Sequence, residues 1–334
     1  MQAAALTAPG TMSLVERPET EQPSADEVLI KVEAVGVCGS DIHYYREGRI
    51  GGQVVEYPFV VGHEFSGIVQ EVGASVTRVK NGDRVAVDPA VSCGTCDQCR
   101  GGRAHTCRNL RFLGCPGQME GCLVERIVMP ARCCFPVSPA LGAAVTALIE
   151  PLSIAIHASR LAGNLQGARV SVHGAGPIGL CVVLACRAAG AGEIRVVEPI
   201  PERRKAALRL GATSADAPGS ATPEVAVTFE CAGEQAAFDE ALSALGPGGR
   251  MIMVGIPSMP RWGFDADLGR RREIALLNVR RQNECMEPAI CLAEAHRENL
   301  DSLVTHRFPL ARCGDAFELV AHRREGVLKA LVEP

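Results

Sequence analysis

The sequence has no long uninterrupted apolar run and no excess of positive charge. Its longest apolar stretch, 178–189, contains Arg187 and is too short to span a bilayer, and residues 1–18 lack the basic flank and apolar core of a signal peptide. The 334 residues carry a net charge of −4, which indicates no general attraction to nucleic acid or to an anionic membrane. These absences predict a cytoplasmic protein that binds neither.

Repeats and low-complexity segments are also absent, and the length of the chain favours two domains. Short β-like runs separated by glycine occupy the chain up to about residue 150, which is typical of an all-β or barrel-like unit. Examples are 28–35, 67–72 and 83–87. From about residue 167, expected strands alternate with expected helices, which predicts βαβ units and a parallel sheet. We expect a joining helix over 150–163, and a helix with a short β-rich tail after residue 288.

Cysteine, by contrast, is abundant. Disulfide frameworks belong to short secreted domains, so 15 cysteines in a chain of this length favour a reducing compartment. Four of them have the spacing C-x2-C-x2-C-x7-C in a glycine-rich loop: Cys93, Cys96, Cys99 and Cys107. Four thiolates this close in sequence can form the tetrahedral shell of a structural zinc. A redox Cys-x-x-Cys pair, an iron–sulfur cluster and a nucleic-acid-binding zinc ribbon are the alternatives. The ten remaining cysteines outside metal patterns, Cys291 among them, are expected to behave mostly as small hydrophobes.

A second set of metal-ligand types lies near the N-terminus. Cys38 directly follows one β-like run, and His63 and Glu64 lie between two others. One thiolate, one imidazole and one carboxylate are the kinds of ligand that a catalytic zinc uses when it keeps a position open. Each of these residues is weak support alone, so the interpretation depends on its context.

A glycine-rich turn at 174–179 follows an expected strand and opens an expected helix. Glycines permit the tight turn and the close approach of a pyrophosphate, while the helix N-terminus supplies amide groups and a positive dipole end. Glu198 ends the next strand, where a carboxylate binds a ribose diol and repels a 2′-phosphate, which favours NAD over NADP. Arg203 is placed either to stack on adenine or to reach a 2′-phosphate. The expected cofactor-binding residues are Gly174, Gly176, Pro177, Ile178, Gly179, Glu198 and Arg203.

Taken in order, these segments resemble the zinc-dependent medium-chain dehydrogenases along essentially the whole chain. The segments that carry the resemblance are 38–45, 62–64, 93–107 and 174–179. Within that family the chain is similar to the polyol (sorbitol/xylitol) dehydrogenase branch, on the segments 43–51, 147–153 and 303–309. The resemblance implies an α/β fold in which a β-rich GroES-like catalytic domain accompanies a doubly wound Rossmann domain. We expect boundaries at 1–151, 152–288 and 289–334, with the last segment completing the catalytic domain and a zinc lobe at about 90–110.

The resemblance also implies roles for individual residues. Two zinc ions per subunit are expected, a structural one on the four-cysteine cluster and a catalytic one on Cys38, His63 and Glu64. Glu150 matches an acidic residue that contacts the water on the catalytic zinc or joins its ligands. Ser40 and His43 match the positions of a proton relay. Tyr44 and Arg281 match substrate-contacting positions, and Glu150 adjoins the substrate; around Arg281 the run 279–284 departs from the aromatic-containing segment of that branch.

These features predict an oxidoreductase that transfers hydride from a secondary alcohol, a sugar alcohol by resemblance, to NAD. Family members are homodimers or homotetramers, so a homo-oligomer is expected. The alternative within the same superfamily is an L-threonine dehydrogenase or another secondary-alcohol dehydrogenase. The alternative from a different class is a non-catalytic sensor that binds NAD and zinc.

Overall fold

The computed structural model describes residues 1–220 and 223–334 and divides the chain into two compact units. The first unit comprises Met1–Glu150 together with Met286–Pro334, and the second comprises Pro151–Cys285. Two separate stretches of chain therefore build the first unit, whereas the second is continuous. Within the described ranges, every helix is too short or too polar to cross a bilayer.

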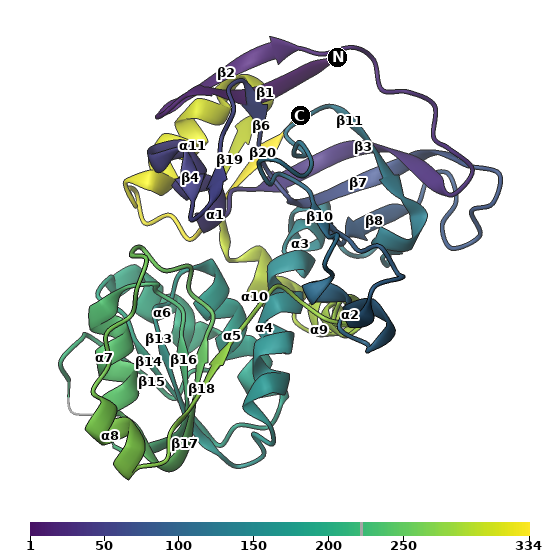
Figure 1. Ribbon diagram of the computed structural model, residues 1–334. Helices are drawn as coiled ribbons and strands as arrows, with labels where there is room; N and C mark the ends of the chain where they lie inside the picture. The colour runs from purple at the N-terminus through teal and green to yellow at the C-terminus, as the bar shows by residue number, and fades with distance from the viewer. Residues whose placement is uncertain (221–222) are drawn as a thin grey trace. The chain divides into compact units, whose positions relative to one another are not determined.

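The first unit is built on a seven-stranded sheet in which all neighbouring strands are antiparallel except β19 and β20. Its order is β12 (Cys134–Pro136), β8 (Arg84–Val87), β7 (Glu64–Val72), β3 (Glu27–Gly36), β20 (Lys329–Glu333) and β19 (Val304–Pro309), with β11 (Arg126–Pro130) also on β3. Valine and isoleucine make β3 a mostly buried strand, as β-branched residues favour. The C-terminal strands lie beside β3 although they come last in the chain (Figure 1).

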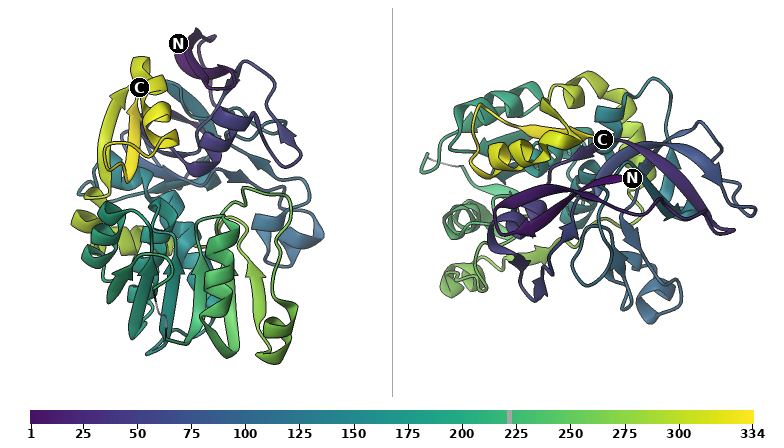
Figure 2. Two further views of the ribbon diagram at one scale, coloured as in Figure 1. Left: turned by 90° about the vertical axis from the view of Figure 1, so that its left-hand side faces the viewer. Right: turned by 90° about the horizontal axis from the view of Figure 1, so that it is seen from above.

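Smaller elements surround this sheet. The strands are β1 (Gln2–Ala8), β2 (Thr11–Glu16), β4 (Arg49–Ile50), β5 (Gln53–Val54), β6 (Phe59–Val60), β9 (Ala90–Val91) and β10 (Arg111–Phe112). The helices are α1 (Gly39–Glu47), α2 (Asp97–Arg100), α3 (Ala143–Ala147), α9 (Met286–Ala295), α10 (Arg297–Asp301) and α11 (Cys313–Ala321). Three 3₁₀ turns are η1 (Ala104–Thr106), η2 (Ala131–Cys133) and η3 (Leu310–Arg312). The core joins both stretches of chain, because Tyr45 of α1 packs on Phe317 of α11 with ring centroids 5.6 Å apart. The two termini lie at the same end of this unit (Figure 2).

The second unit contains a six-stranded, fully parallel sheet. Its order is β15 (Ser214–Asp216), β14 (Glu193–Val197), β13 (Arg169–His173), β16 (Val225–Glu230), β17 (Leu245–Met253) and β18 (Ala275–Asn278). The helices are α4 (Ile149–Ala162), which begins in the first unit, α5 (Pro177–Ala188), α6 (Pro201–Arg209), α7 (Gln235–Ser243) and α8 (Ala266–Arg271). Helices flank both faces of the sheet (Figure 1). The chain runs outward from β13 in one direction and then from β16 in the other, which is the doubly wound arrangement with its switch point between these strands.

The predicted fold class is confirmed, with differences in detail. From Met286 onward the chain contains three helices, where one was expected after residue 288. The expectation for Cys291 is wrong, because this residue lies on the exposed face of α9. An amphipathic helix buries only one side, so apolar neighbours in sequence do not bury every residue between them.

Candidate zinc and nucleotide sites

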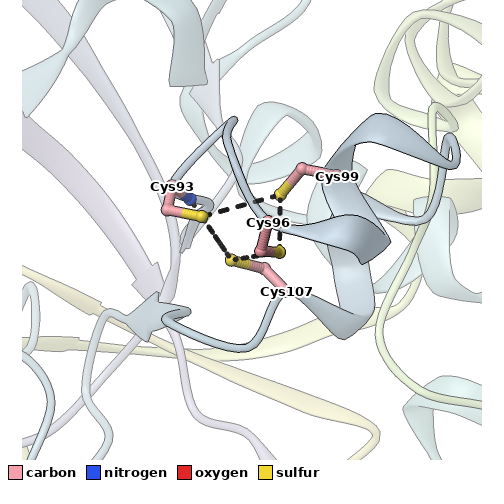
Figure 3. Close-up of side chains that lie close together, drawn as sticks. All are labelled: Cys93, Cys96, Cys99 and Cys107. Atoms are coloured by element: carbon pink, nitrogen blue, oxygen red, sulfur yellow. Dashed lines mark hydrogen bonds between the residues drawn. The ribbon is translucent and has the colours of Figure 1, made fainter.

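The four cysteines of the 93–107 loop converge on one point (Figure 3). The Sγ atoms of Cys93 and Cys107 are 3.4 Å apart, those of Cys96 and Cys99 3.6 Å, and those of Cys96 and Cys107 3.8 Å. Four sulfurs at about 2.3 Å from a central ion lie about 3.8 Å apart in a tetrahedron. A disulfide would instead bring two sulfurs to about 2 Å. The spacing of these sulfurs therefore fits a zinc ion and not a pair of disulfides.

The backbone of this loop favours thiolates. Hydrogen bonds from the amide and then the hydroxyl of Thr95 lower the pKa of Cys93 to about 5, and an amide donor at Arg108 lowers the pKa of Cys96. Desolvation and the neighbouring thiols act the other way on Cys99 and raise its pKa to about 11. Amide donors stabilise negative sulfur, so the hydrogen bonds of this loop favour the thiolates that a thiophilic cation binds.

Cys38, His63 and Glu64 also come together. Their ligand atoms, one from each residue, all lie within 4.8 Å of one another. The sheet brings this about, because Gly36 at the end of β3 pairs with Glu64 at the start of β7. Cys38 follows β3 by two residues and caps α1, so the end of one strand and the beginning of its neighbour present their ligands at one place.

Asp41 is a residue of this site that sequence reasoning missed. It is buried on α1, where one of its carboxylate oxygens accepts a 3.0 Å hydrogen bond from the amide of Cys38. Its other oxygen lies 3.4 Å from Nδ1 of His63, which leaves Nε2 of that ring for a metal. Burial acts to lower the pKa of His63, but the charges of Asp41 and Cys38 outweigh it and raise the pKa well above its usual value. The Cys-x-x-Asp spacing is that of a capping box at a helix start, and it could have indicated the position of Asp41 from the sequence.

Two further ionisable groups adjoin these three residues. The ammonium of Lys329, on β20, contacts Oε2 of Glu64, and both side chains are buried. Burial acts to lower the pKa of Lys329, but Glu64 and Cys38 outweigh it and raise that pKa. Glu150 is buried at the start of α4, and burial raises its pKa to about 8, while the charge of His63 lowers that pKa and the charge of Glu64 raises it. Glu150 is not one of the residues whose ligand atoms meet within 4.8 Å.

The expected relay and substrate residues Ser40, His43 and Tyr44 lie on α1, in the turns that follow Cys38. His43 is partly exposed, and its Nδ1 lies 3.4 Å from the carboxylate of Glu47 one turn further on. Tyr44 is buried and donates a 3.2 Å hydrogen bond to the side chain of Gln53. The helix therefore places a partly exposed His43 and a buried Tyr44 in the turns that follow the metal ligand Cys38.

In the second unit, the glycine turn adopts the form expected for phosphate binding. Gly174 has a φ of 97°, which only glycine adopts readily, and a Cβ on Gly179 would collide with the carbonyl of Gly174. Gly176 caps α5 and has open space where a Cβ would lie, apart from Nη1 of Arg203 at 3.8 Å. Pro177 occupies the first turn of α5, followed by Ile178. The backbone of the turn is therefore closely packed at Gly179, while Gly176 faces open space at a helix N-terminus that favours anions.

Glu198 braces this turn. Its carboxylate accepts hydrogen bonds from the amides of Ala175, at 2.7 Å, and Ile200, at 2.9 Å. Only 3% of the residue is exposed, so it is no solvated strand end. Arg204, next to the predicted Arg203, donates to the carbonyl of Glu198 at 2.6 Å.

Glu230 is a second residue that sequence reasoning missed. It ends β16, beside His173 at the end of β13, and is fully buried. Its carboxylate accepts hydrogen bonds from the amides of Ala232, at 2.8 Å, and Gly233, at 2.7 Å. It therefore orders the loop that follows the switch point. Arg281 also belongs to this unit, where it follows β18 with a φ of 55°.

Two family models match the chain. The family model described as alcohol dehydrogenase GroES-like domain matches residues 24–139, and the one described as zinc-binding dehydrogenase matches residues 177–294. Sorbitol dehydrogenase of Bacillus subtilis is 38% identical over 320 residues, which cover 92% of this chain and 90% of the relative. The chain belongs to the zinc-dependent medium-chain dehydrogenases. The predicted family is thus confirmed, and with it an oxidoreductase activity.

Solved structures support the same conclusion for the fold of this dehydrogenase. L-idonate 5-dehydrogenase from Escherichia coli superimposes with a TM-score of 0.93 at 26% identity, over 100% of this chain and 98% of the other. A zinc-binding dehydrogenase from Sinorhizobium meliloti, bound to NADP, gives a TM-score of 0.90 at 29% identity, over 100% and 99% of the two chains. The GroES-like and Rossmann parts of the predicted fold are therefore both present.

Proposed function

We propose that this medium-chain dehydrogenase oxidises a secondary alcohol of the polyol class with NAD as hydride acceptor. The convergence of Cys38, His63 and Glu64 on one point carries the proposal, because a thiolate, an imidazole and a carboxylate form a metal site that leaves a position for substrate. The names of its relatives, sorbitol dehydrogenase and L-idonate 5-dehydrogenase, support a polyhydroxylated substrate.

The donor atoms fit zinc at both places. In the first site, Asp41 fixes the ring of His63, as carboxylates commonly do behind zinc-binding histidines. In the second, the four cysteines Cys93, Cys96, Cys99 and Cys107 supply a closed set of thiolates, which suits a structural ion. We therefore assign a catalytic zinc to the first set and a structural zinc to the second. A zinc ion in the first site supplies Lewis acidity that lowers the pKa of an alcohol, whose hydride the nicotinamide accepts.

The chain's own groups have to move the alcohol proton away. Ser40 and His43 lie on the same helix, and the side chain of His43 is 24% exposed while that of Glu47 is 56% exposed. A proton that reaches His43 therefore has a carboxylate next to it that opens to solvent. Burial raises the pKa of Glu150 to about 8, which favours the protonated form of its carboxyl, a hydrogen-bond donor near the ligands.

Cofactor choice and substrate contacts are assigned on chemical grounds. The buried carboxylate of Glu198 beside the glycine turn favours a ribose diol over a 2′-phosphate, which supports NAD, while Arg203 lies next to Gly176 on the side where the pyrophosphate would approach. Tyr44 and Arg281 are assigned to the substrate by their match to the polyol branch. A homodimer or homotetramer is proposed on the same basis.

The test is NAD reduction, followed at 340 nm, with sorbitol, xylitol and L-threonine, together with zinc counting. We expect two zinc ions per chain, and turnover with at least one polyol that a chelator abolishes. Turnover with threonine alone would replace the polyol by the amino-acid alternative. Absence of turnover with every alcohol, despite bound NAD and two zinc ions, would support a sensor and reject the proposal.

A further inference from the structure

Lys329 is a buried cation that the proposed chemistry does not yet use. Only 1% of the residue is exposed, and its ammonium contacts the carboxylate of Glu64 directly. Lysine is rarely buried unless it is paired, because removing an ammonium from water is costly. Its partner, Glu64, is one of the three residues assigned to the catalytic zinc. The ion pair that offsets the desolvation of Lys329 therefore lies within the metal site.

The sheet is constructed around this contact. Leu331 on β20, Gly36 on β3 and Glu64 on β7 pair in one row across three neighbouring strands. Lys329 lies two residues before Leu331 and therefore on the same face of the sheet. Between the two charged residues stands Gly36, where a Cβ would lie 2.5 Å from Oε2 of Glu64 and 2.7 Å from Cε of Lys329. The absence of a side chain at Gly36 is what lets the lysine cross a strand and reach the carboxylate.

The charges around Lys329 are mutually balanced. The negative groups that act on its ammonium are Glu64, Cys38 and Asp41. One lysine and one divalent ion would balance these three, with His63 neutral as a ligand. Without the lysine the same pocket would carry one net negative charge around the metal, and the whole carboxylate of Glu64 would be left to the zinc ion. Opposite charges a few ångströms apart attract more strongly inside a protein than in water, so this difference is large.

We propose that Lys329 is a positioning residue that shares the carboxylate of Glu64 with the zinc ion and so keeps Glu64 a weak, displaceable ligand. This inference rests on the proposed function, because it needs zinc at Cys38, His63 and Glu64. One oxygen of Glu64 stays with the lysine, which reduces the negative charge that the carboxylate offers to the metal. Glu64 can then yield to an incoming alcohol oxygen. If the lysine served stability alone, its removal would loosen the site and release zinc.

The two roles predict opposite changes in the variant Lys329→Met. We expect zinc to leave the catalytic site for a chelator about tenfold more slowly than in the wild type, with kcat reduced by about tenfold or more. The visible spectrum of the cobalt-substituted protein should shift, because Glu64 becomes a full ligand. The variant Lys329→Gln keeps a hydrogen-bond donor without the charge and should behave like Lys329→Met. Lys31→Met, which removes an exposed lysine from β3, is the matched control and should match the wild type.

A double-mutant cycle guards against a folding defect and locates the effect. Glu64→Gln combined with Lys329→Met removes both buried charges, and we expect this pair to fold. The effect of Lys329→Met on zinc release should largely disappear in the Glu64→Gln background, because the lysine acts through that carboxylate. An equal effect in both backgrounds, faster zinc release from Lys329→Met, or wild-type behaviour of that variant would each overturn the inference. A wild-type protein with only the four-cysteine zinc would instead reject the proposed function itself, and the inference with it.

Discussion

Glu198 accepts a 2.7 Å hydrogen bond from the amide of Ala175, so the acidic residue after β14 holds the glycine turn that precedes α5. A second hydrogen bond, from Ile200, fixes the other carboxylate oxygen at the start of α6. The same side chain thus shapes the turn and sets the charge where the adenosine ribose is expected. Its two functions can be separated by removing the charge while keeping the shape.

The first prediction concerns Glu198→Gln. Because the carboxylate repels a 2′-phosphate, we expect the ratio of kcat/KM for NADP to that for NAD to rise about tenfold. The KM for NAD should also increase, since one of the two braces of the turn is weakened. Steady-state kinetics with both cofactors provide the measurement. Glu202→Gln, an exposed acidic residue in the first turn of α6, is the control and should leave the ratio unchanged. An unchanged ratio in Glu198→Gln would show that the carboxylate braces the turn and does not select between NAD and NADP.

The second prediction separates the two zinc ions. Cys38→Ser should retain one zinc per chain and lose NAD reduction by at least about a hundredfold, because serine is a poor zinc ligand and the structural cluster is untouched. Cys107→Ser should also lose one zinc but show a lower unfolding temperature, since structural zinc contributes to folding. Zinc counting, kinetics and thermal unfolding of both variants test this, with exposed Cys291→Ser as the control. Two zinc ions in Cys38→Ser would contradict the assignment.

The third prediction concerns the space at Gly36. A methyl group there would press on both Glu64 and Lys329, so Gly36→Ala should lower the free energy of unfolding by about 1–3 kcal/mol, as overpacking does. The catalytic zinc should leave faster, while the four-cysteine zinc stays. Urea unfolding and chelator kinetics measure the two effects. Gly52→Ala, where a Cβ meets nothing within 4 Å, should be close to neutral, and equal behaviour of the two variants would show that Gly36 is not constrained.

The fourth prediction is a pH dependence of stability. His173 ends β13, its Nε2 lies 3.0 Å from the hydroxyl of Ser171, and burial, followed by the charge of Arg195, lowers its pKa to about 4. In the unfolded chain this histidine is protonated with the usual pKa of about 6.5. The folded state therefore loses stability as the pH falls from about 6.5 to about 4, and it loses no stability through His173 above that range. The loss attributable to this residue approaches about 3 kcal/mol.

The variant His173→Gln removes this titration. Urea unfolding at several pH values between 7 and 4.5 should therefore give a steeper loss of stability for the wild type than for the variant. Above pH 7 the free energies of unfolding of the two proteins should change with pH in parallel. Parallel curves over the whole range would show that His173 titrates alike in the folded and unfolded chain.

Local patterns made much of the fold and its motifs predictable from the sequence. The glycine turn at 174–179 and the four-cysteine loop at 93–107 are each one continuous stretch of sequence, so their spacing indicates what their backbone and side chains can bind. Alternating strands and helices after residue 167 likewise predicted the parallel sheet, because a βαβ unit needs only neighbouring segments. Asp41 was within reach of the same reasoning, since it stands three residues after Cys38 at the start of a helix.

Contacts between distant segments were not predictable. A single lysine in the last strand reads as an ordinary solvated residue, and only the pairing of β20 with β3 places Lys329 beside Glu64. Glu230 resembles any acidic residue at a strand end until the loop folds its amides back onto the carboxylate. The helices of the C-terminal segment were also missed in part, because their short amphipathic faces become meaningful only against the sheet they cover.

The position of Lys329 has a consequence for biosynthesis. It lies 265 residues after Glu64, so at typical rates of about 5–20 residues per second the ribosome makes it on the order of tens of seconds after the metal ligands have emerged. During that interval the nascent chain exposes Cys38, His63 and Glu64 without their cation, while the continuous segment Pro151–Cys285 can already fold. Metal acquired by the nascent chain would therefore meet a more anionic set of ligands than the finished protein presents.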